Sequence, residues 1–117
     1  RILYLGESDK VNELYNLMDV FVLPSNHEGL GIVFIEAQIN GLPVVTSDQV
    51  PREIDLGGKV VFLPLQNSPQ SWADEILTIK KTNRLEYYDK HYKEIIRYNI
   101  NDNVKTLEEY YQCMMRN

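Results

Sequence analysis

The chain has 117 residues, the size of one domain, with 44% hydrophobic and 25% charged residues, as is usual for a globular protein. No apolar run approaches the about 20 residues that cross a bilayer, and the N-terminus has no signal-peptide pattern, so we expect a cytoplasmic protein. The single cysteine, Cys113, excludes an internal disulfide and a thiolate cluster. His27 and His91 lack metal-ligand spacing, so no metal is expected.

The negative charge is concentrated in the first two thirds of the chain. Residues 1–79 contain four Lys and Arg against eleven Asp and Glu, a balance of −7. Residues 80–117 contain eight against six, a balance of +2, and the two parts add to the net charge of −5. Because affinity for a phosphate backbone comes from Lys and Arg, the acidic main body argues against nucleic acid as a partner.

The first predicted element is a buried strand at residues 1–6, where the apolar run RILYL ends in a glycine turn. A helix is predicted over residues 7–18, with Ser8 and Asp9 as candidate N-caps. Its apolar residues recur at the i, i+3, i+4, i+7 spacing of an amphipathic helix. They are Val11, Leu14, Tyr15 and Met18.

A second continuous apolar run predicts a strand at residues 19–24. Beyond a polar loop, residues 30–40 predict a helix that ends at Gly41, and Pro43 follows as a residue that cannot continue it. Residues 42–47, LPVVTS, predict a third strand.

Residues 48–58 are polar and rich in turn residues, with one helical turn predicted, and residues 59–65 predict a fourth strand. Ser68 followed by Pro69 is typical of a helix N-cap with proline at the first helical position. The apolar face of that helix is predicted to consist of Trp72, Ile76 and Ile79.

Two further helices are predicted over residues 84–99 and 101–115. The last helix is predicted to turn Val104, Leu107, Tyr111 and Met114 inward. Short apolar strands separated by helices indicate a parallel sheet covered on both faces. We therefore predict an α/β domain with a β/α core at residues 1–66 and an all-helical end at residues 67–117.

The loop at residues 24–31 is the best site candidate, because ligands of open α/β sheets bind beyond the carboxyl ends of the strands. Gly29 and Gly31 lack Cβ atoms and lead into a helix N-terminus, where backbone N–H groups can hold a phosphate. Glu28 and Glu36 stand on either side of this glycine step. The spacing alone is compatible with a catalytic pair, with a sugar clamp, or with a helix cap and a solvated helix residue.

Glu36 is the more informative of the two acids. At 1.5 Å per residue it lies about 7–8 Å along the helix from Gly31, within reach of a ribose diol above a bound phosphate. It is also the only charged residue in GLGIVFIEAQING, whereas an exposed helix face normally carries several charges. Glu28 is compatible with contact to a sugar or with a capping role.

Residues 19–48, DVFVLPSNHEGLGIVFIEAQINGLPVVTSD, resemble the C-terminal, donor-binding half of retaining GT-B glycosyltransferases. These nucleotide-sugar enzymes carry an E-x7-E pattern, and the spacing of Glu28 and Glu36 matches it. Residues 4–25, 49–77 and 99–111 are similar to the flanking segments of bacterial capsular and exopolysaccharide transferases, of the family 4-like, group 1 type. The resemblance covers nearly all of the chain and implies a Rossmann-like fold.

The resemblance implies a role for each site residue. Glu28 is the catalytic-site residue and contacts the donor sugar near the reacting centre, as a positioning and electrostatic group. The backbone of Gly29, Leu30 and Gly31 holds the distal phosphate, and Glu36 binds the ribose hydroxyls. Similar enzymes transfer the sugar with retention at its anomeric carbon and need no metal or other cofactor; the donor is a nucleotide diphosphate sugar.

The resemblance begins at what would be the third strand of the C-terminal domain, so the N-terminal acceptor domain is expected to be absent. The cationic pair that clamps the diphosphate is also expected to be absent, and residues 11–51 contain no Lys or Arg. Arg52 is the nearest cation. We therefore expect this chain alone to be inactive. In the expected strand order 3-2-1-4-5-6 its first strand lacks neighbours, which predicts edge pairing between copies.

The leading hypothesis is thus the donor-binding part of a glycosyltransferase that acts on a glycan or lipid-linked acceptor, with the parent enzyme peripheral at the inner face of the membrane. The alternative is a non-catalytic module of the same fold that binds a nucleotide sugar or a protein. A flavodoxin-like signalling domain is disfavoured, because Asp48 stands alone where an acidic cluster would be required.

Overall fold

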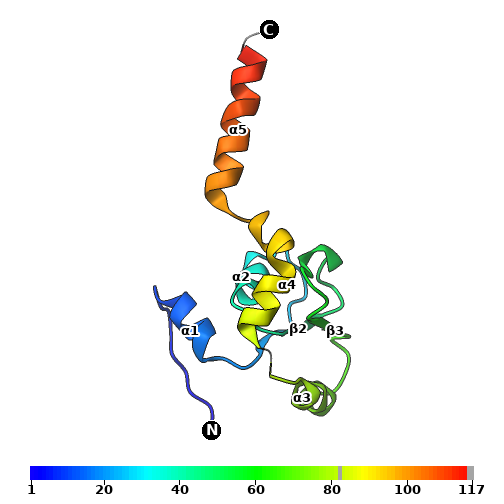
Figure 1. Cartoon of the computed structure of the whole chain (residues 1–117). Helices are drawn as coiled ribbons and strands as arrows, with labels where there is room; N and C mark the ends of the chain where they lie inside the picture. The colour runs from blue at the N-terminus through cyan, green and yellow to red at the C-terminus, as the bar shows by residue number, and fades with distance from the viewer. Residues whose placement is uncertain (82, 116–117) are drawn as a thin grey trace.

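The computed structural model describes residues 1–81 and 83–115 and confirms an α/β fold with a parallel sheet. Its elements are α1 (Val11–Leu17), β1 (Phe21–Leu23), α2 (Ile32–Ile39), β2 (Val44–Ser47), the 3-10 turn η1 (Arg52–Ile54), β3 (Val60–Leu63), α3 (Pro69–Thr78), α4 (Arg84–Ile96) and α5 (Ile100–Met115). The three strands of the described residues lie side by side in the order β1-β2-β3, of which Figure 1 labels β2 and β3. In register, Phe21 lies opposite Val44, and Val44 lies opposite Val60.

The sheet separates α2 from α3, as the alternation of side chains along β1 shows. Phe21 and Leu23 point into the main core with α2, because alternate residues of a strand face the same side. Val22 points the other way and lines a hollow of about 390 Å³ with Trp72 of α3. The prediction that helices cover both faces is therefore confirmed.

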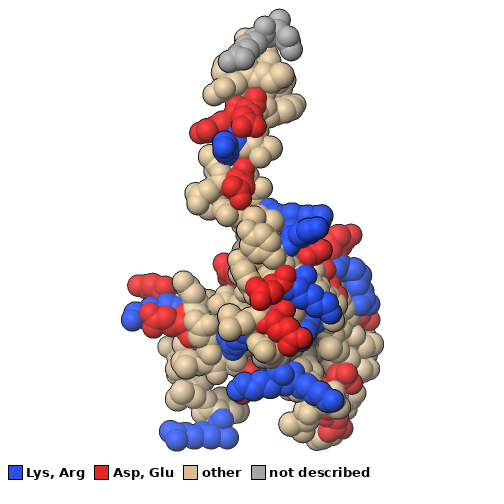
Figure 2. All heavy atoms as spheres, in the orientation of Figure 1, with Lys and Arg blue, Asp and Glu red and all other residues tan. Residues whose placement is uncertain are grey.

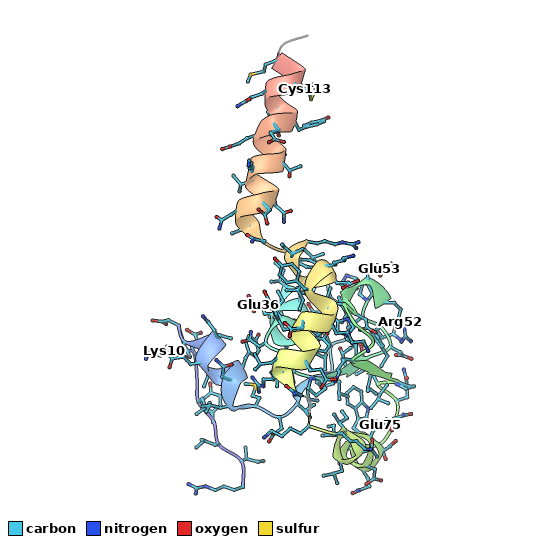
Figure 3. The ribbon with its side chains drawn as sticks, viewed as in Figure 1. Lys10, Glu36, Arg52, Glu53, Glu75 and Cys113 are labelled. Atoms are coloured by element: carbon cyan, nitrogen blue, oxygen red, sulfur yellow. The ribbon has the colours of Figure 1, made fainter. Side chains whose placement is uncertain are left out.

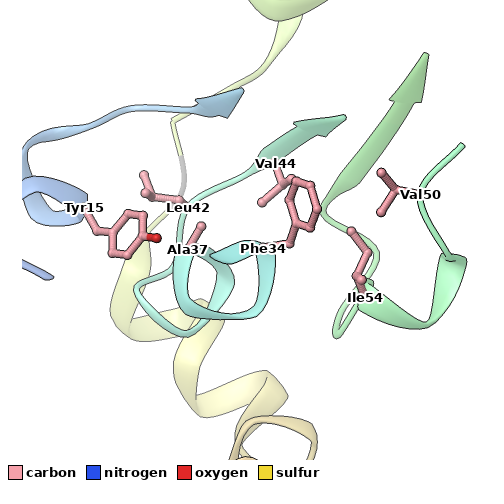
Figure 4. Close-up of a cluster of buried hydrophobic side chains, with 7 residues drawn as sticks. All are labelled: Tyr15, Phe34, Ala37, Leu42, Val44, Val50 and Ile54. Carbon is pink, nitrogen blue, oxygen red and sulfur yellow. The ribbon is translucent and has the colours of Figure 1, made fainter. Parts of the chain in front are cut away.

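The main core lies between the sheet and α2, and its members come from five segments of the chain (Figure 4). The buried cluster consists of Tyr15, Phe34, Ala37, Leu42, Val44, Val50 and Ile54. Phe21 joins it by two edge-on ring contacts, at 5.8 Å to the Tyr15 ring and 6.1 Å to the Phe34 ring. The core thus ties α1, β1 and α2 together directly beside the candidate loop.

A buried glutamine fixes η1 to α2. The Gln38 side-chain nitrogen donates to the Phe34 carbonyl at 3.0 Å and to the Ile54 carbonyl at 2.7 Å. Its side-chain oxygen accepts from the Leu56 backbone N–H at 2.9 Å. Because a buried amide is costly unless its groups are paired, this network fixes where the segment after β2 runs.

Two predicted helix termini are confirmed, the end of α2 and the start of α3. Gly41 follows α2 with φ of 72°, and the backbone N–H of Leu42 donates to the Ala37 carbonyl at 3.0 Å, a glycine stop. Ser68 is the N-cap of α3, and its hydroxyl accepts from the Ser71 N–H at 3.2 Å with Pro69 at the first helical position. Trp72 is buried on this helix, while Ile76 and Ile79 are partly buried.

The predicted strand at residues 1–6 is wrong. These residues form no strand, and Ile2, Leu3, Tyr4 and Leu5 are 57–98% exposed. A strand needs a neighbour for its backbone hydrogen bonds, and in the described chain β1 ends the sheet with no strand on its outer side. Edge pairing between copies stays a prediction.

The start of α1 also differs from the sequence prediction. Lys10 is the N-cap, without a side-chain cap, and neither Ser8 nor Asp9 is; the Ser8 hydroxyl, two residues before the N-cap, accepts from the Lys10 N–H at 3.1 Å. Of the predicted apolar stripe only Tyr15 is buried.

The guanidinium of Arg84 in α4 holds the end of α1. It donates to the carbonyls of Tyr15 at 3.1 Å and Met18 at 2.6 Å, and to the Asn16 side-chain oxygen at 3.3 Å. The last four carbonyls of a helix lack the N–H partners of a following turn, and a cation at this end of the helix is favourable. The position of α1 therefore depends on α4, which begins far along the chain.

The prediction that α5 turns its apolar stripe inward is wrong. Figure 1 shows α5 extending away from the body, and the stripe of Val104, Leu107, Tyr111 and Met114 is 45–58% exposed. The radius of gyration is 17.1 Å, against about 13 Å for a compact domain of this length. The stripe has the spacing of a packed helix, but the described chain offers no surface for it.

We expect the amide hydrogens of α5 to exchange with solvent far faster than those of β2. An isolated helix of about 15 residues is marginal in water, and α5 has 16 residues with none buried. The amide hydrogens of the fully buried β2 should exchange only when a larger part of the structure unfolds transiently. Hydrogen exchange followed by mass spectrometry measures both segments at once. Equal protection of α5 and β2 would show that α5 is covered in solution.

Candidate functional site

The candidate loop lies where predicted, at the carboxyl end of β1. The Ser25 hydroxyl donates to the Glu28 carboxylate at 2.6 Å, and the Ser25 N–H donates to the Leu23 carbonyl at 2.9 Å. The Ser47 hydroxyl, at the end of β2, donates to the Ser25 carbonyl. Glu28 is therefore held in a partly buried position by a loop that is itself attached to two strands.

Gly31 is the residue at which the loop becomes α2. It is the N-cap, buried, with φ of 63°, a left-handed conformation that favours glycine. A Cβ atom at Gly31 would lie 2.8 Å from Phe34 Cδ2, so the core also requires glycine here. In the described chain no side chain caps α2, which leaves its first N–H groups available to an anion.

The rest of the glycine step is open. A Cβ atom at Gly29 would meet nothing within 4 Å, and Leu30 is exposed. Gly29 and Gly31 thus have different roles in the structure: the second is required by the fold, whereas the first leaves space in front of the helix.

Glu36 lies on the exposed side of α2 and contacts α1 rather than the glycine step. Its Oε2 accepts a hydrogen bond of 3.2 Å from the Tyr15 hydroxyl. The two residues line a hollow of about 310 Å³ between the helices, together with Val11, Asn12, Ile39 and Asn40. Figure 3 shows Glu36 on α2 in the middle of the body.

Sequence reasoning found the two acids and the glycine step but missed the partners that hold the acids. Tyr15 was predicted only as a core residue of α1, and Ser25 was given no role. Ser25 is three residues before Glu28, a spacing that permits a local side-chain contact. Tyr15 and Glu36 are 21 residues apart, and no local signal predicts their contact.

Arg52 is engaged elsewhere. Its guanidinium lies 3.9 Å from the centre of the Phe62 ring, a cation–π contact at the β3 side of the body. In Figure 3 it lies well to the side of Glu36. Figure 2 shows Lys and Arg interspersed with Asp and Glu over the face in view, so this face carries no single-sign basic patch.

Two buried tyrosines predict a loss of stability at alkaline pH. Burial raises the pKa of Tyr15 to about 12, helped by the charge of Glu36 and its hydrogen bond. Burial likewise raises the pKa of Tyr87 to about 12, helped by Asp55 and Glu94. In the unfolded chain these phenols ionise near pH 10, so their contribution is complete below pH 10 and is lost as the pH rises from 10 to 12.

Thermal unfolding measured between pH 9 and pH 12 tests this, with Tyr15→Phe/Tyr87→Phe beside the unchanged chain. The unfolding temperature should fall less steeply in the double variant. Tyr111→Phe, at an exposed position of α5, is the matched control and should follow the unchanged chain. Identical pH profiles for all three chains would contradict the prediction.

Among residues 1–81 and 83–115, no helix is long and apolar enough to cross a bilayer, and no three His, Cys, Asp or Glu side chains are grouped to hold a metal. A family described as "Glycosyl transferases group 1" matches residues 1–81. No solved structure matches the chain.

Three curated relatives carry names from glycan biosynthesis. EpsF of Bacillus subtilis (strain 168), named as a glycosyltransferase, is 42% identical over 76 residues, 64% of this chain and 20% of EpsF. The lipopolysaccharide core biosynthesis mannosyltransferase LpsB of Rhizobium meliloti (strain 1021) is 42% identical over 48 residues, 41% of this chain and 14% of LpsB. The O-antigen biosynthesis glycosyltransferase WclY of Escherichia coli is 29% identical over 90 residues, 77% of this chain and 25% of WclY. The chain thus spans a quarter or less of each of these relatives.

Proposed function

We propose that this chain, which belongs to the glycosyl transferases of group 1, has the following function. It forms the nucleotide-sugar donor-binding part of a retaining glycosyltransferase in polysaccharide biosynthesis. One observation carries the proposal. Glu28 and Glu36, at E-x7-E spacing, stand on a strand-end loop and on the helix that follows it, on either side of an uncapped helix N-terminus. In a nucleotide-sugar donor, the sugar, the phosphates and the ribose follow one another in the same order as Glu28, the helix N-terminus and Glu36.

In this proposal each part of the loop binds one part of the donor. Glu28, held by Ser25, accepts hydrogen bonds from the sugar hydroxyls near the reacting carbon. The N–H groups of Gly29, Leu30 and Gly31 face the distal phosphate, where the helix dipole favours negative charge. Glu36 accepts from the ribose hydroxyls.

The proposed reaction is front-face transfer with retention. The leaving phosphate helps to deprotonate the acceptor hydroxyl, which attacks from the same side, so no group of this chain has to act as nucleophile. Glu28 then positions the sugar and stabilises positive charge at its anomeric carbon. The acceptor, a glycan or a lipid-linked glycan, is held by a second domain, so this chain alone transfers no sugar. No metal takes part in this route.

One observation favours the alternative, a binding module that has lost its activity. Residues 11–51 contain no Lys or Arg, and Arg52 is stacked on Phe62. Charge-assisted hydrogen bonds are the strong ones, so a diphosphate facing backbone amides alone is held weakly.

A titration by nuclear magnetic resonance tests the proposed function, since it detects weak binding. UDP-, GDP- and ADP-sugars are added in turn to the chain and to Glu36→Ala. We expect one nucleotide series to shift resonances of residues 28–36 and to bind at least about tenfold more weakly to the variant, since hydrogen bonds to a charged group contribute about 1.5–3 kcal/mol. The same samples should show no sugar transfer.

Shifts that avoid residues 28–36, or equal affinities for both chains, would contradict the donor-binding assignment. Sugar transfer by the chain alone would contradict its expected inactivity. If donor binds, the same nucleotide series is then tested for transfer by a longer chain that includes a second domain. Binding without transfer there would select the non-catalytic alternative.

A further inference from the structure

Tyr15 joins the core to the candidate site. Its ring is only 4% exposed and packs edge-on against Phe21. Its hydroxyl donates to Oε2 of Glu36 at 3.2 Å, and Glu36 is an exposed residue of α2. A rigid buried ring therefore presents a hydrogen-bond donor to a carboxylate at the surface.

The hydroxyl is not needed for the packing of α1. A phenylalanine at position 15 would fill the same space, and the exposed Glu36 carboxylate would take a water molecule in its place. A hydrogen bond to an exposed carboxylate therefore adds little to folding. The hydrogen bond from Tyr15 instead fixes the direction of the Glu36 side chain. Without it, this long and flexible side chain would lose rotamer freedom when it binds a ligand.

Tyr15 is itself fixed from the other side. Arg84 donates to the Tyr15 carbonyl at 3.1 Å and to the Met18 carbonyl at 2.6 Å, so the last turn of α1 is attached to α4. On α2, the Asn40 side chain donates to the Glu36 carbonyl at 2.9 Å. The backbones of both residues are thus held by contacts outside the pair.

We infer that Tyr15 is a positioning residue for Glu36: it holds Oε2 and leaves Oε1 to accept from the vicinal hydroxyl groups of a ligand. A carboxylate oxygen whose direction is set before binding discriminates for a diol more strongly than a mobile one. The adjoining hollow of about 310 Å³ lies at the lower end of small-molecule pocket volumes and suits a pentose. This inference rests on the proposed function, in which Glu36 binds the ribose.

The test compares ribonucleotides with deoxyribonucleotides. The probes are UDP, GDP and ADP, each beside its 2′-deoxy form, which lacks one of the two ribose hydroxyls. They are titrated by nuclear magnetic resonance into the unchanged chain, Tyr15→Phe, Glu36→Ala and Tyr87→Phe. The last is the matched control, because Tyr87 is also buried but its hydroxyl has no hydrogen-bond partner among the described residues.

We expect the unchanged chain to prefer the ribose form of one nucleotide by about tenfold, the contribution of one hydrogen bond to a charged group. In Tyr15→Phe the affinity for the ribose form should fall about three- to tenfold, and the affinity for the deoxy form, which keeps one of the two hydroxyls, should fall clearly less. Glu36→Ala should show no preference, and Tyr87→Phe should match the unchanged chain.

Each failure has a distinct pattern. An equal loss of both affinities in Tyr15→Phe means a purely structural role and overturns the inference. A preference that Glu36→Ala abolishes and Tyr15→Phe retains overturns the inference while the proposed function stands. Absence of any ribose preference in the unchanged chain overturns the ribose role of Glu36, and the inference about Tyr15 with it.

Discussion

Replacing Phe34 with alanine is expected to lower the midpoint of thermal unfolding by about 10–25 °C. The Phe34 side chain is fully buried at the centre of the core between α2 and the sheet. Truncation of a buried phenylalanine costs about 3–5 kcal/mol, and natural domains have only about 5–15 kcal/mol of stability. The loss is expected to be near the upper figure, because Phe34 contacts Phe21 edge-on and no other described ring lies against it to fill the space.

The matched control for Phe34→Ala is Leu77→Ala in α3. Leu77 is 83% exposed, so its truncation should change the free energy of unfolding by less than about 0.5 kcal/mol. Circular dichroism measured during heating gives both midpoints. Equal shifts for the two variants would mean that the core between α2 and the sheet does not dominate the stability of the chain.

Alanine at Gly31 and at Gly29 should separate stability from binding. Gly31→Ala forces an alanine into the left-handed region and places its Cβ 2.8 Å from Phe34 Cδ2 and 3.3 Å from Ile54 Cγ2. Left-handed backbone costs about 1–2 kcal/mol and overpacking about 1–3 kcal/mol. The free energy of unfolding should therefore fall by about 2–4 kcal/mol, because both neighbouring side chains are buried in the core.

Gly29→Ala, two residues earlier, meets no atom within 4 Å and has no left-handed backbone. Its stability should stay within about 0.5 kcal/mol of the unchanged chain. If the distal phosphate of a donor lies against this loop, the added methyl group should still weaken donor binding in the titration described above. Chemical denaturation measures the first quantity for both variants. Equal destabilisation at the two positions would contradict the different roles assigned to them.

Local sequence signals predicted the elements whose formation is decided locally. The apolar runs of β1, β2 and β3, the glycine stop after α2 and the Ser68–Pro69 start of α3 all appear at the predicted places. The same kind of signal failed for residues 1–6, which form no strand, and for the burial of the apolar stripe of α5, although α5 is a helix as predicted. An apolar pattern indicates which side chains of a segment can be buried. Whether they are buried depends on a neighbouring surface, which lies elsewhere in the chain or outside it.

The candidate site likewise combines features that a short stretch of sequence decides with one contact that depends on the whole fold. The loop and α2 follow from strand, glycine and helix signals in one short stretch, so Glu28, Gly31 and Glu36 lie on the predicted elements. The hydrogen bond between Tyr15 and Glu36 depends on how α1 packs, and α1 is held by Arg84, 69 residues after Tyr15. Such a contact follows from the assembled fold and cannot be read from spacing.

The contact made by Arg84 bears on where this domain can be divided. The match to the family covers residues 1–81, yet the guanidinium that holds the end of α1 belongs to Arg84. A chain cut after residue 81 would keep the E-x7-E acids and the glycine step and lose the hydrogen bonds that attach the end of α1 to α4. A domain boundary drawn at the end of the family match would therefore leave out a residue that helps to hold Tyr15, the hydrogen-bond donor to Glu36.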